Sequence, residues 1–185
     1  MLGKKRGNML RLIQLLPFIL VGIARAASKQ ERESFPEFAQ LLDGYNYDWE
    51  TKQVKTADGW HLTLFHLIGV KGRDQKVHAE WNLHESAQYP LLVLHGAYDS
   101  AYGVLSRGIF DKPWILKIVD QGYDVWLYNA RGIKYSDKND RDGTWSLKER
   151  WNFTFADMGT YDLPAVIDEV LEATKSNKLT LTGHS

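Results

Sequence analysis

Three short β-prone runs constrain the fold of this chain more than any other sequence feature. Residues 91–94 are Leu or Val throughout and end directly in His95-Gly96, residues 123–128 form a second run, and residues 178–182 form a third. Continuous rather than alternating apolarity, as in residues 91–94, is typical of a strand buried on both faces of a parallel sheet. The pattern therefore predicts an α/β protein with parallel central strands.

Segments with helical patterns separate these runs. Residues 113–121 predict a helix, because Pro113 suits a first helical turn. Thr154 with Asp157 resembles a capping box for another helix, which Pro164 should break or restart. Apolar residues then repeat at helical spacing, at Leu163, Val166, Ile167, Val170 and Leu171. Strands that alternate with helices imply parallel βαβ units with right-handed crossovers.

An antiparallel hairpin is expected before the parallel strands. Residues 54–68 contain two β-prone runs that flank Asp58-Gly59, a favoured turn pair. Four other segments are expected to have supporting roles: a loose lead-in over residues 28–34, a short helix over 35–42, and polar connections over 69–89 and 129–145.

The composition and charge exclude several classes of protein. With 44% hydrophobic and 25% charged residues, the chain is globular rather than disordered. The absence of cysteine excludes disulfides, thiolate metal sites and a cysteine nucleophile within the chain. No phosphate-binding glycine motif occurs, and His78 and His84 lack the carboxylate spacing of a metal site, so neither a cofactor nor a metal is expected.

The N-terminus has the three parts of a secretory signal peptide. Residues 4–6 are basic, residues 12–23 are mainly apolar, and residues 24–26 supply small side chains for cleavage. The apolar run is shorter than the roughly 20 residues that span a bilayer. We expect residues 1–26 to be cleaved, with no stable transmembrane span; an uncleaved membrane anchor is the alternative. Both interpretations place the chain in the secretory pathway, either secreted or in a lysosome-like compartment.

The charge balance argues against a nucleic-acid partner. The chain has 23 basic and 23 acidic side chains, but residues 1–26 hold five of the bases and none of the acids. The remainder therefore carries more acids than bases. A mildly acidic domain is a poor electrostatic partner for a phosphate backbone.

The candidate chemistry follows two of the predicted strands. Gly183-His184-Ser185 has the form of the first half of a G-x-S-x-G nucleophile elbow, although an ordinary turn at a strand end is the alternative. Ser185 is the candidate nucleophile. The backbone N–H of Ala97 is the candidate oxyanion donor, because it follows an earlier buried strand. His95 is expected to hydrogen-bond its loop rather than to act as the catalytic base.

Several blocks together resemble the acid lipase family, which includes gastric and lysosomal acid lipases. The blocks are His95-Gly96, residues 123–132, Trp151-x-Phe153-Thr154-Phe155-x-x-Met158, residues 161–165 and Gly183-His184-Ser185, with residues 56–60 also similar. The resemblance spans roughly residues 40–185. It implies an α/β-hydrolase that cleaves triacylglycerols or cholesteryl esters, often in acidic compartments, with Ser185 as nucleophile and Ala97 as oxyanion donor.

The resemblance assigns no catalytic role to Trp126, Asn129, Arg131 or Asp162, and structural roles suit these residues better. Arg131 is expected to tie a loop, Asp162 to cap the helix that starts at Pro164, and Trp126 and Asn129 to be structural. The chain departs from the family's pattern at Tyr128 and Ala130, and at the pair Ala97-Tyr98. These departures bear on substrate preference more than on chemistry.

In this fold the acid and the histidine of the triad follow the serine. All six histidines precede Ser185. We therefore expect the N-terminal part of an α/β-hydrolase fold, incomplete at its C-terminus: a signal peptide over 1–26, a lead-in over 27–50 and a partial lipase domain over 51–185. This chain alone is expected to be inactive, and its last strand to be an exposed edge.

The expected function is hydrolysis of carboxylic esters of neutral lipids at a lipid–water interface. A general esterase and an inactive, secreted lipase-like module that binds lipid or a partner are the alternatives. Asn152-Phe153-Thr154 is a glycosylation sequon whose aromatic neighbours could bury it. The tryptophans are expected to be core or loop anchors more than walls of an acyl pocket.

Overall fold

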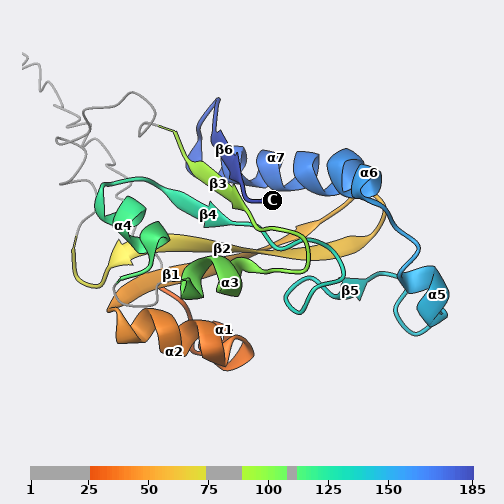
Figure 1. The fold of residues 1–185 in the computed structure, drawn as a ribbon, viewed down its shortest axis with the longest axis horizontal. Coiled ribbons are helices and arrows are strands. Elements are labelled where there is room, and N and C mark those ends of the chain that lie inside the picture. The colour runs from red at the N-terminus through yellow and green to blue at the C-terminus, as the bar shows by residue number, and fades with distance from the viewer. Residues whose placement is uncertain (1–25, 74–88, 108–111) are drawn as a thin grey trace, which may run out of the picture.

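The computed structural model of the protein describes residues 26–73, 89–107 and 112–185 (Figure 1). The expected signal peptide, except for its last residue, lies outside the described residues, as do His78, Trp81 and His84. Within the described ranges, no helix has the length and apolar character needed to cross a membrane.

The centre of the fold is one mixed six-stranded sheet. The strands are β1 (Tyr47–Lys55), β2 (Trp60–Val70), β3 (Leu91–Leu94), β4 (Val125–Leu127), β5 (Lys138–Asn139) and β6 (Thr180–Gly183). Their order is β1-β2-β4-β3-β6, and β5 pairs with β2. The β1–β2 and β2–β4 pairs are antiparallel, whereas β4–β3 and β3–β6 are parallel. The predicted fold class, a hairpin followed by parallel βαβ units, is confirmed.

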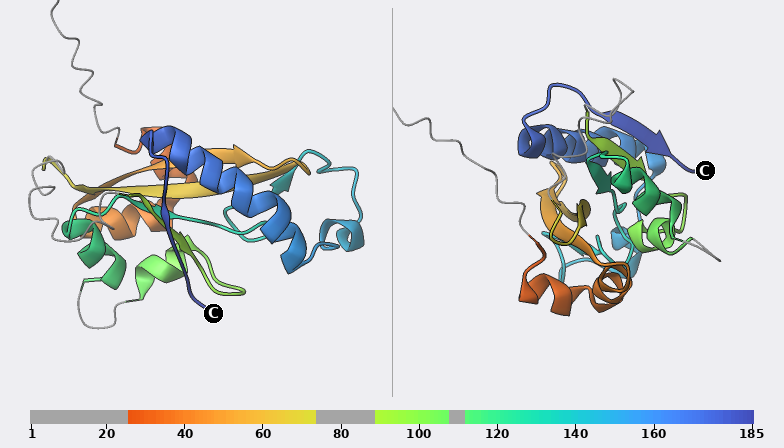
Figure 2. Two further views of the ribbon diagram at one scale, coloured as in Figure 1. Left: turned by 90° about the horizontal axis from the view of Figure 1, so that it is seen from above. Right: turned by 90° about the vertical axis from the view of Figure 1, so that its left-hand side faces the viewer.

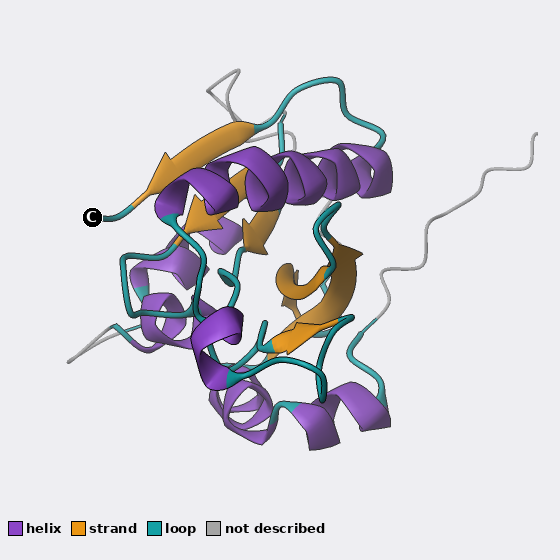
Figure 3. Ribbon diagram, turned by 90° about the vertical axis from the view of Figure 1, so that its right-hand side faces the viewer, coloured by secondary structure: helices purple, strands orange, loops and turns teal. Residues whose placement is uncertain are grey.

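Helices cover both faces of this sheet (Figure 2). They are α1 (Lys29–Ser34), α2 (Pro36–Gly44), α3 (Ala101–Ser106), α4 (Trp114–Asp120), α5 (Leu147–Arg150), α6 (Phe155–Asp157) and α7 (Leu163–Thr174), with a π-helical turn at Met158–Asp162. One core layer joins α2, α3 and α4 to the sheet, and a second joins α7 to the opposite face. Figure 3 shows α7 lying alone along its side of the strands.

Burial of the central strands explains their continuous apolarity. Leu91 and Val93 of β3 pack into the core under α3 and α4, whereas Leu92 packs against Val166 and Val170 of α7. Each residue of the strand thus has an apolar environment on its own side, as in parallel sheets generally. β6 lies at the end of the strand order with Leu181 46% exposed, which confirms the expected exposed edge.

One sequence-based expectation about a helix was wrong, and another helix was not expected at all. Residues 28–34 are not a loose lead-in, because Ser28 and Glu31 form a reciprocal capping box that starts α1. This helix buries none of its residues, so no apolar periodicity marks it in the sequence. α3 was also missed; it starts at Ser100, whose side chain accepts a hydrogen bond from the backbone N–H of Gly103. The capping box of Thr154 with Asp157 is confirmed.

His66 of β2 lies between two carboxylates. Its Nδ1 is 3.0 Å from Glu50 of β1 and its Nε2 is 2.6 Å from Asp124, just before β4. The imidazole also stacks on the indole of Trp126, with ring centroids 4.0 Å apart. Burial favours the neutral ring, but the hydrogen bonds to Asp124 and Glu50 outweigh it and raise the pKa of His66 above 6.5.

The His66 cluster gives the fold a specific pH dependence. Because the pKa of His66 is higher in the folded state, the cluster stabilises the protein fully below the ordinary histidine pKa. That contribution is lost as pH rises through the raised pKa. The measurement is the free energy of urea unfolding at several pH values. We expect His66→Gln to remove this decline, and His61→Gln, at an exposed histidine, to keep it. An identical pH profile for wild type and His66→Gln would contradict the assignment.

Candidate active site

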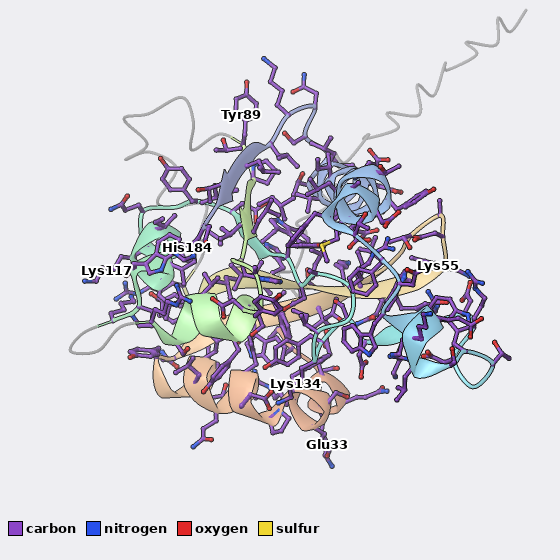
Figure 4. All side chains as sticks on the ribbon, turned by 45° about the vertical axis from the view of Figure 1, so that its right-hand side comes forward. Glu33, Lys55, Tyr89, Lys117, Lys134 and His184 are labelled. Carbon is purple, nitrogen blue, oxygen red and sulfur yellow. The ribbon has the colours of Figure 1, made fainter. Side chains whose placement is uncertain are left out.

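The candidate site lies where β3 and β6 end side by side. The two strands are parallel, and Leu94 of β3 is in register with Gly183 of β6. Because parallel strands present their carboxyl ends at the same edge, the segments that follow them meet there. Figure 4 shows His184 at this end of β6. The structure thereby brings together Ser185 and the loop that contains Ala97, which are 88 positions apart in the sequence.

The contact between these two segments explains the glycine after His95. A Cβ atom placed on Gly96 would lie 3.0 Å from the carbonyl oxygen of His184 and 3.4 Å from Cβ of Ser185. Any side chain here would push the loop away from the serine. Ser185 itself has a φ of 60°, in the left-handed region that non-glycine residues adopt uncommonly. A serine held in such a turn is typical of a nucleophile elbow.

Ser185 and Ala97 line one cavity of about 510 Å³. This volume is within the range of about 300–1,000 Å³ that is usual for small-molecule sites. The walls are mainly apolar and aromatic; they include Leu94, Tyr98, Tyr128, Ile133, Trp151, Phe153, Phe155, Met158 and Leu163. Among the tryptophans, Trp126 is a core residue as expected, whereas Trp151 lines the cavity and is 55% exposed.

His95 is fixed by hydrogen bonds on both ring nitrogens. Its Nδ1–H donates to the carbonyl of Gly96 at 2.8 Å, and its Nε2 accepts from the N–H of Ala130 at 3.0 Å. This pairing needs the neutral ring, and burial lowers the pKa of His95 below 6.5. The geometry agrees with the expectation that His95 orders the loop, because neither nitrogen is left to take a proton from Ser185.

Arg131, which is among the residues that line the cavity, joins two carboxylates from distant parts of the chain. Its Nη1 is 2.5 Å from Asp58 in the β1–β2 turn, and its Nη2 is 2.6 Å from Asp162 in the π-helical turn. The side chains of Arg131 and Asp162 are 1% and 0% exposed. Burial alone would lower the pKa of Arg131, but the bonds to Asp162 and Asp58 outweigh burial and raise that pKa above its ordinary value. The predicted role of Arg131 in tying a loop is confirmed.

The predicted capping role of Asp162 was wrong. Its carboxylate accepts hydrogen bonds from Arg131 and from the phenol of Tyr128, the latter at 2.9 Å, instead of from the backbone of α7. An unpaired buried charge is very costly. The carboxylate of Asp162 therefore pairs with the buried guanidinium of Arg131 rather than with a backbone N–H of the helix. The helix instead restarts at Leu163 with Pro164 in its first turn. Burial and the Asp162 carboxylate raise the pKa of Tyr128.

Trp126 and Asn129 have the structural roles that were expected. Asn129 is buried, where its side chain donates to the carbonyl of Thr63 at 2.8 Å and accepts from the N–H of Ala101 at 2.9 Å. It therefore joins β2, the loop after β4 and the start of α3. Trp126 is buried under α7, with its indole N–H 3.1 Å from Asp124. In the described part of the chain, no group of three or more metal-binding side chains occurs.

Tyr128 is the member of the site whose role the sequence did not reveal. It bonds Asp162 through its phenol, lies parallel to the His95 ring at a centroid distance of 5.7 Å, and lines the cavity. The departure from the family's pattern at Tyr128 was the only sequence signal. Its partner Asp162 is 34 positions away and could not be identified without the fold.

We expect the buried ion pair of Arg131 with Asp162 to contribute far more to the free energy of unfolding than an exposed ion pair does. Arg131→Met leaves Asp162 charged and buried without its partner, which costs about 3–5 kcal/mol. Arg150→Met is the control, because Arg150 pairs with Asp142 at the surface and such pairs contribute about 0–1 kcal/mol. Urea unfolding of both variants at neutral pH measures the difference. Equal losses of unfolding free energy in the two variants would show that the buried pair stabilises the protein no more than the surface pair does.

The comparisons with known proteins define the class of the protein. Residues 89–185, more than half of the chain, match the alpha/beta hydrolase fold family. The chain therefore belongs to that family.

Its curated relatives are lipases, which confirms the resemblance to the gastric and lysosomal acid lipases. Lipase 1 of Drosophila melanogaster is 36% identical over 146 residues, and gastric triacylglycerol lipase of Bos taurus is 32% identical over 154 residues. Human lipase member K is 30% identical over 175 residues. These alignments cover 79%, 83% and 90% of this chain but 29%, 36% and 40% of the relatives. The chain thus spans about a third of the length of these relatives.

Among solved structures, an esterase from Pyrococcus furiosus is similar with a TM-score of 0.48 and 17% identity. The match covers 77% of this chain and 44% of that chain.

Proposed function

We propose that this chain is the N-terminal part of a serine hydrolase that cleaves carboxylic esters of neutral lipids, either triacylglycerols or steryl esters. The observation that carries the proposal is that Ser185 and Ala97 line one mainly apolar cavity at the carboxyl ends of β3 and β6. Ligands of open α/β sheets bind at this edge. The lipase relatives support a lipid ester as the substrate class.

In the proposed reaction, the hydroxyl oxygen of Ser185 attacks the ester carbonyl carbon and its proton passes to a histidine. The carbonyl oxygen then carries a negative charge, which the N–H of Ala97 and the N–H of the residue after Ser185 stabilise. The histidine returns the proton to the leaving alcohol as the C–O bond breaks. Water hydrolyses the acyl-enzyme by the same steps and releases the fatty acid.

The catalytic acid and histidine are proposed to come from sequence beyond Ser185. Two observations support this. The relatives are about three times as long as the matched segment, and His95, the histidine that lines the cavity among the described residues, has both ring nitrogens occupied. The 185-residue chain by itself is therefore proposed to hydrolyse no ester.

Covalent labelling tests the nucleophile. In the full-length protein, a serine-reactive fluorophosphonate should label one residue, and Ser185→Ala should abolish both the labelling and the hydrolysis of a triacylglycerol, because it removes the proposed nucleophilic hydroxyl. Ser106→Ala is the matched control: Ser106 is exposed at the end of α3, where its hydroxyl donates to the carbonyl of Gly103. Peptide mapping identifies the labelled residue.

Unchanged labelling in Ser185→Ala would overturn the proposed nucleophile. A full-length protein that is never labelled and hydrolyses neither triacylglycerols nor short-chain esters, but still binds lipid, would favour the inactive lipase-like module. Hydrolysis confined to short-chain esters would instead favour a general esterase.

We further propose that the protein enters the secretory pathway, is secreted or delivered to a lysosome-like compartment, and carries a glycan on Asn152. Asn152 is exposed in the segment between α5 and α6, so its aromatic neighbours do not bury it. Thr154 of the sequon is also an exposed residue at the start of α6, with its hydroxyl bonded to Asp157 in the capping box.

Intact mass of the native protein tests these points together. Treatment with an N-glycosidase should lower the mass by one glycan, and Asn152→Gln should remove that change because the acceptor amide is gone. The deglycosylated mass should exceed 21.3 kDa, since the protein is proposed to continue. A mass that the glycosidase leaves unchanged would contradict the glycan. A deglycosylated mass at or below 21.3 kDa would contradict the longer chain.

A further inference from the structure

Tyr98 combines two unfavourable features in one residue. Its φ is 63°, in the left-handed region, and its side chain is fully exposed to solvent, with a relative exposure of 104%. A bulky side chain at positive φ is an outlier, because its Cβ crowds the following carbonyl. Exposed tyrosine adds no packing that could offset the strain. The residue therefore does nothing for the stability of the isolated fold.

The other described non-glycine residues with positive φ have evident structural reasons. Asn46 is of a residue type that tolerates this conformation, and Lys175 is the left-handed cap that ends α7. Ser185 lies in the proposed nucleophile elbow. Tyr98 is the third residue of a turn closed by the N–H of Asp99 and the carbonyl of Gly96, a position where a positive φ favours glycine or asparagine over tyrosine. Strained residues of this kind cluster at ligand sites.

The conformation of Tyr98 is imposed by its neighbours. The N–H of Asp99 donates to the carbonyl of Gly96 at 3.1 Å, which closes a turn around Tyr98. The Asp99 carboxylate then accepts from the N–H of Ser100 and from Arg107, at 2.8 and 2.6 Å. These bonds hold the turn against the start of α3.

The turn places Tyr98 at the edge of the cavity that contains Ser185. Tyr98 directly follows Ala97 and lines the cavity, as do Trp151 and Phe155, which are 55% and 76% exposed. These three rings come from separate segments, before α3, after α5 and in α6. An aromatic ring offers a large apolar contact area with only two side-chain torsions to fix, so it gains free energy when an apolar ligand covers it.

We propose that Tyr98 is a specificity-determining residue whose ring contacts the acyl chain of the ester at Ser185. The proposal rests on the proposed function, because it takes the ligand of the cavity to be a long-chain acyl group. It goes further by assigning the recognition of chain length to one residue beside the oxyanion donor. Long acyl chains reach the ring, whereas short ones end inside the cavity.

A binding experiment separates this role from catalysis. Full-length protein that carries Ser185→Ala is titrated with cis-parinaric acid, a fluorescent long-chain fatty acid. Tyr98→Asn keeps a residue that accepts positive φ but removes the ring, and it should weaken the affinity on the order of tenfold. Tyr98→Phe keeps the ring and should bind as tightly as the parent. Lys175→Asn is the matched control, with the same backbone exchange at the far end of α7.

Steady-state kinetics of the full-length protein with Ser185 unchanged give a second measurement. Tyr98→Asn should raise KM for a long-chain ester and leave KM for a butyrate ester unchanged, with kcat of both nearly constant. Equal affinity of Tyr98→Asn and its parent for cis-parinaric acid would overturn the proposal, as would a parent protein that does not bind the probe. If Ser185 is never labelled but Tyr98→Asn still loses the probe, the acyl contact stands and the hydrolase proposal fails.

Discussion

The arrangement of this fold around its site depends on the buried ion cluster of Arg131 with Asp58 and Asp162. The three residues lie in the turn of the β1–β2 hairpin, in the loop after β4 and in the π-helical turn before α7. The pairing of β5 with β2 joins the first two of these segments, and Arg131 ties both of them to the third. The guanidinium of Arg131 and the carboxylate of Asp162 are removed from water, whereas that of Asp58 is 27% exposed, and charged groups in such a cluster satisfy one another only at short distances and fixed angles. The cluster therefore fixes the positions of all three segments at once.

This constraint reaches the candidate nucleophile through a short series of contacts. Asp162 accepts a hydrogen bond from Tyr128, whose ring lies parallel to that of His95. His95 bonds the carbonyl of Gly96, and Gly96 packs against the backbone of His184 and the side chain of Ser185. Each step is a direct contact between neighbours in space. An oxyanion donor at Ala97 needs this kind of support, because its contribution depends on placement to within a fraction of an ångström.

The side of the cavity at Tyr98, which we call its outer wall, is held in place by different interactions. The turn around Tyr98 is held by Asp99, and the close approach of α3 requires Gly103, since a Cβ there would lie 1.7 Å from Oδ1 of Asp99. The inner wall, at Tyr128 and His95, thus depends on the ion cluster of Arg131, whereas the outer wall depends on the hydrogen-bonded turn around Tyr98. The inner wall is positioned by the core, and the outer wall is available to contact a ligand.

The sequence by itself determined the class of fold, the parallel strands, the hairpin, the helices after Pro113 and Thr154, and the placement of Ser185 and Ala97 at strand ends. These follow from local rules, because apolar periodicity, turn pairs and capping residues act within a few positions of one another. It did not reveal α1, which buries nothing, or the partner of Asp162. Only the tertiary structure decided that Asp162 pairs with Arg131 rather than capping α7, that Tyr128 connects this pair to His95, and that Tyr98 is strained at the cavity. Each of these depends on segments that are distant in the chain and adjacent in space, and no local pattern records such a pairing.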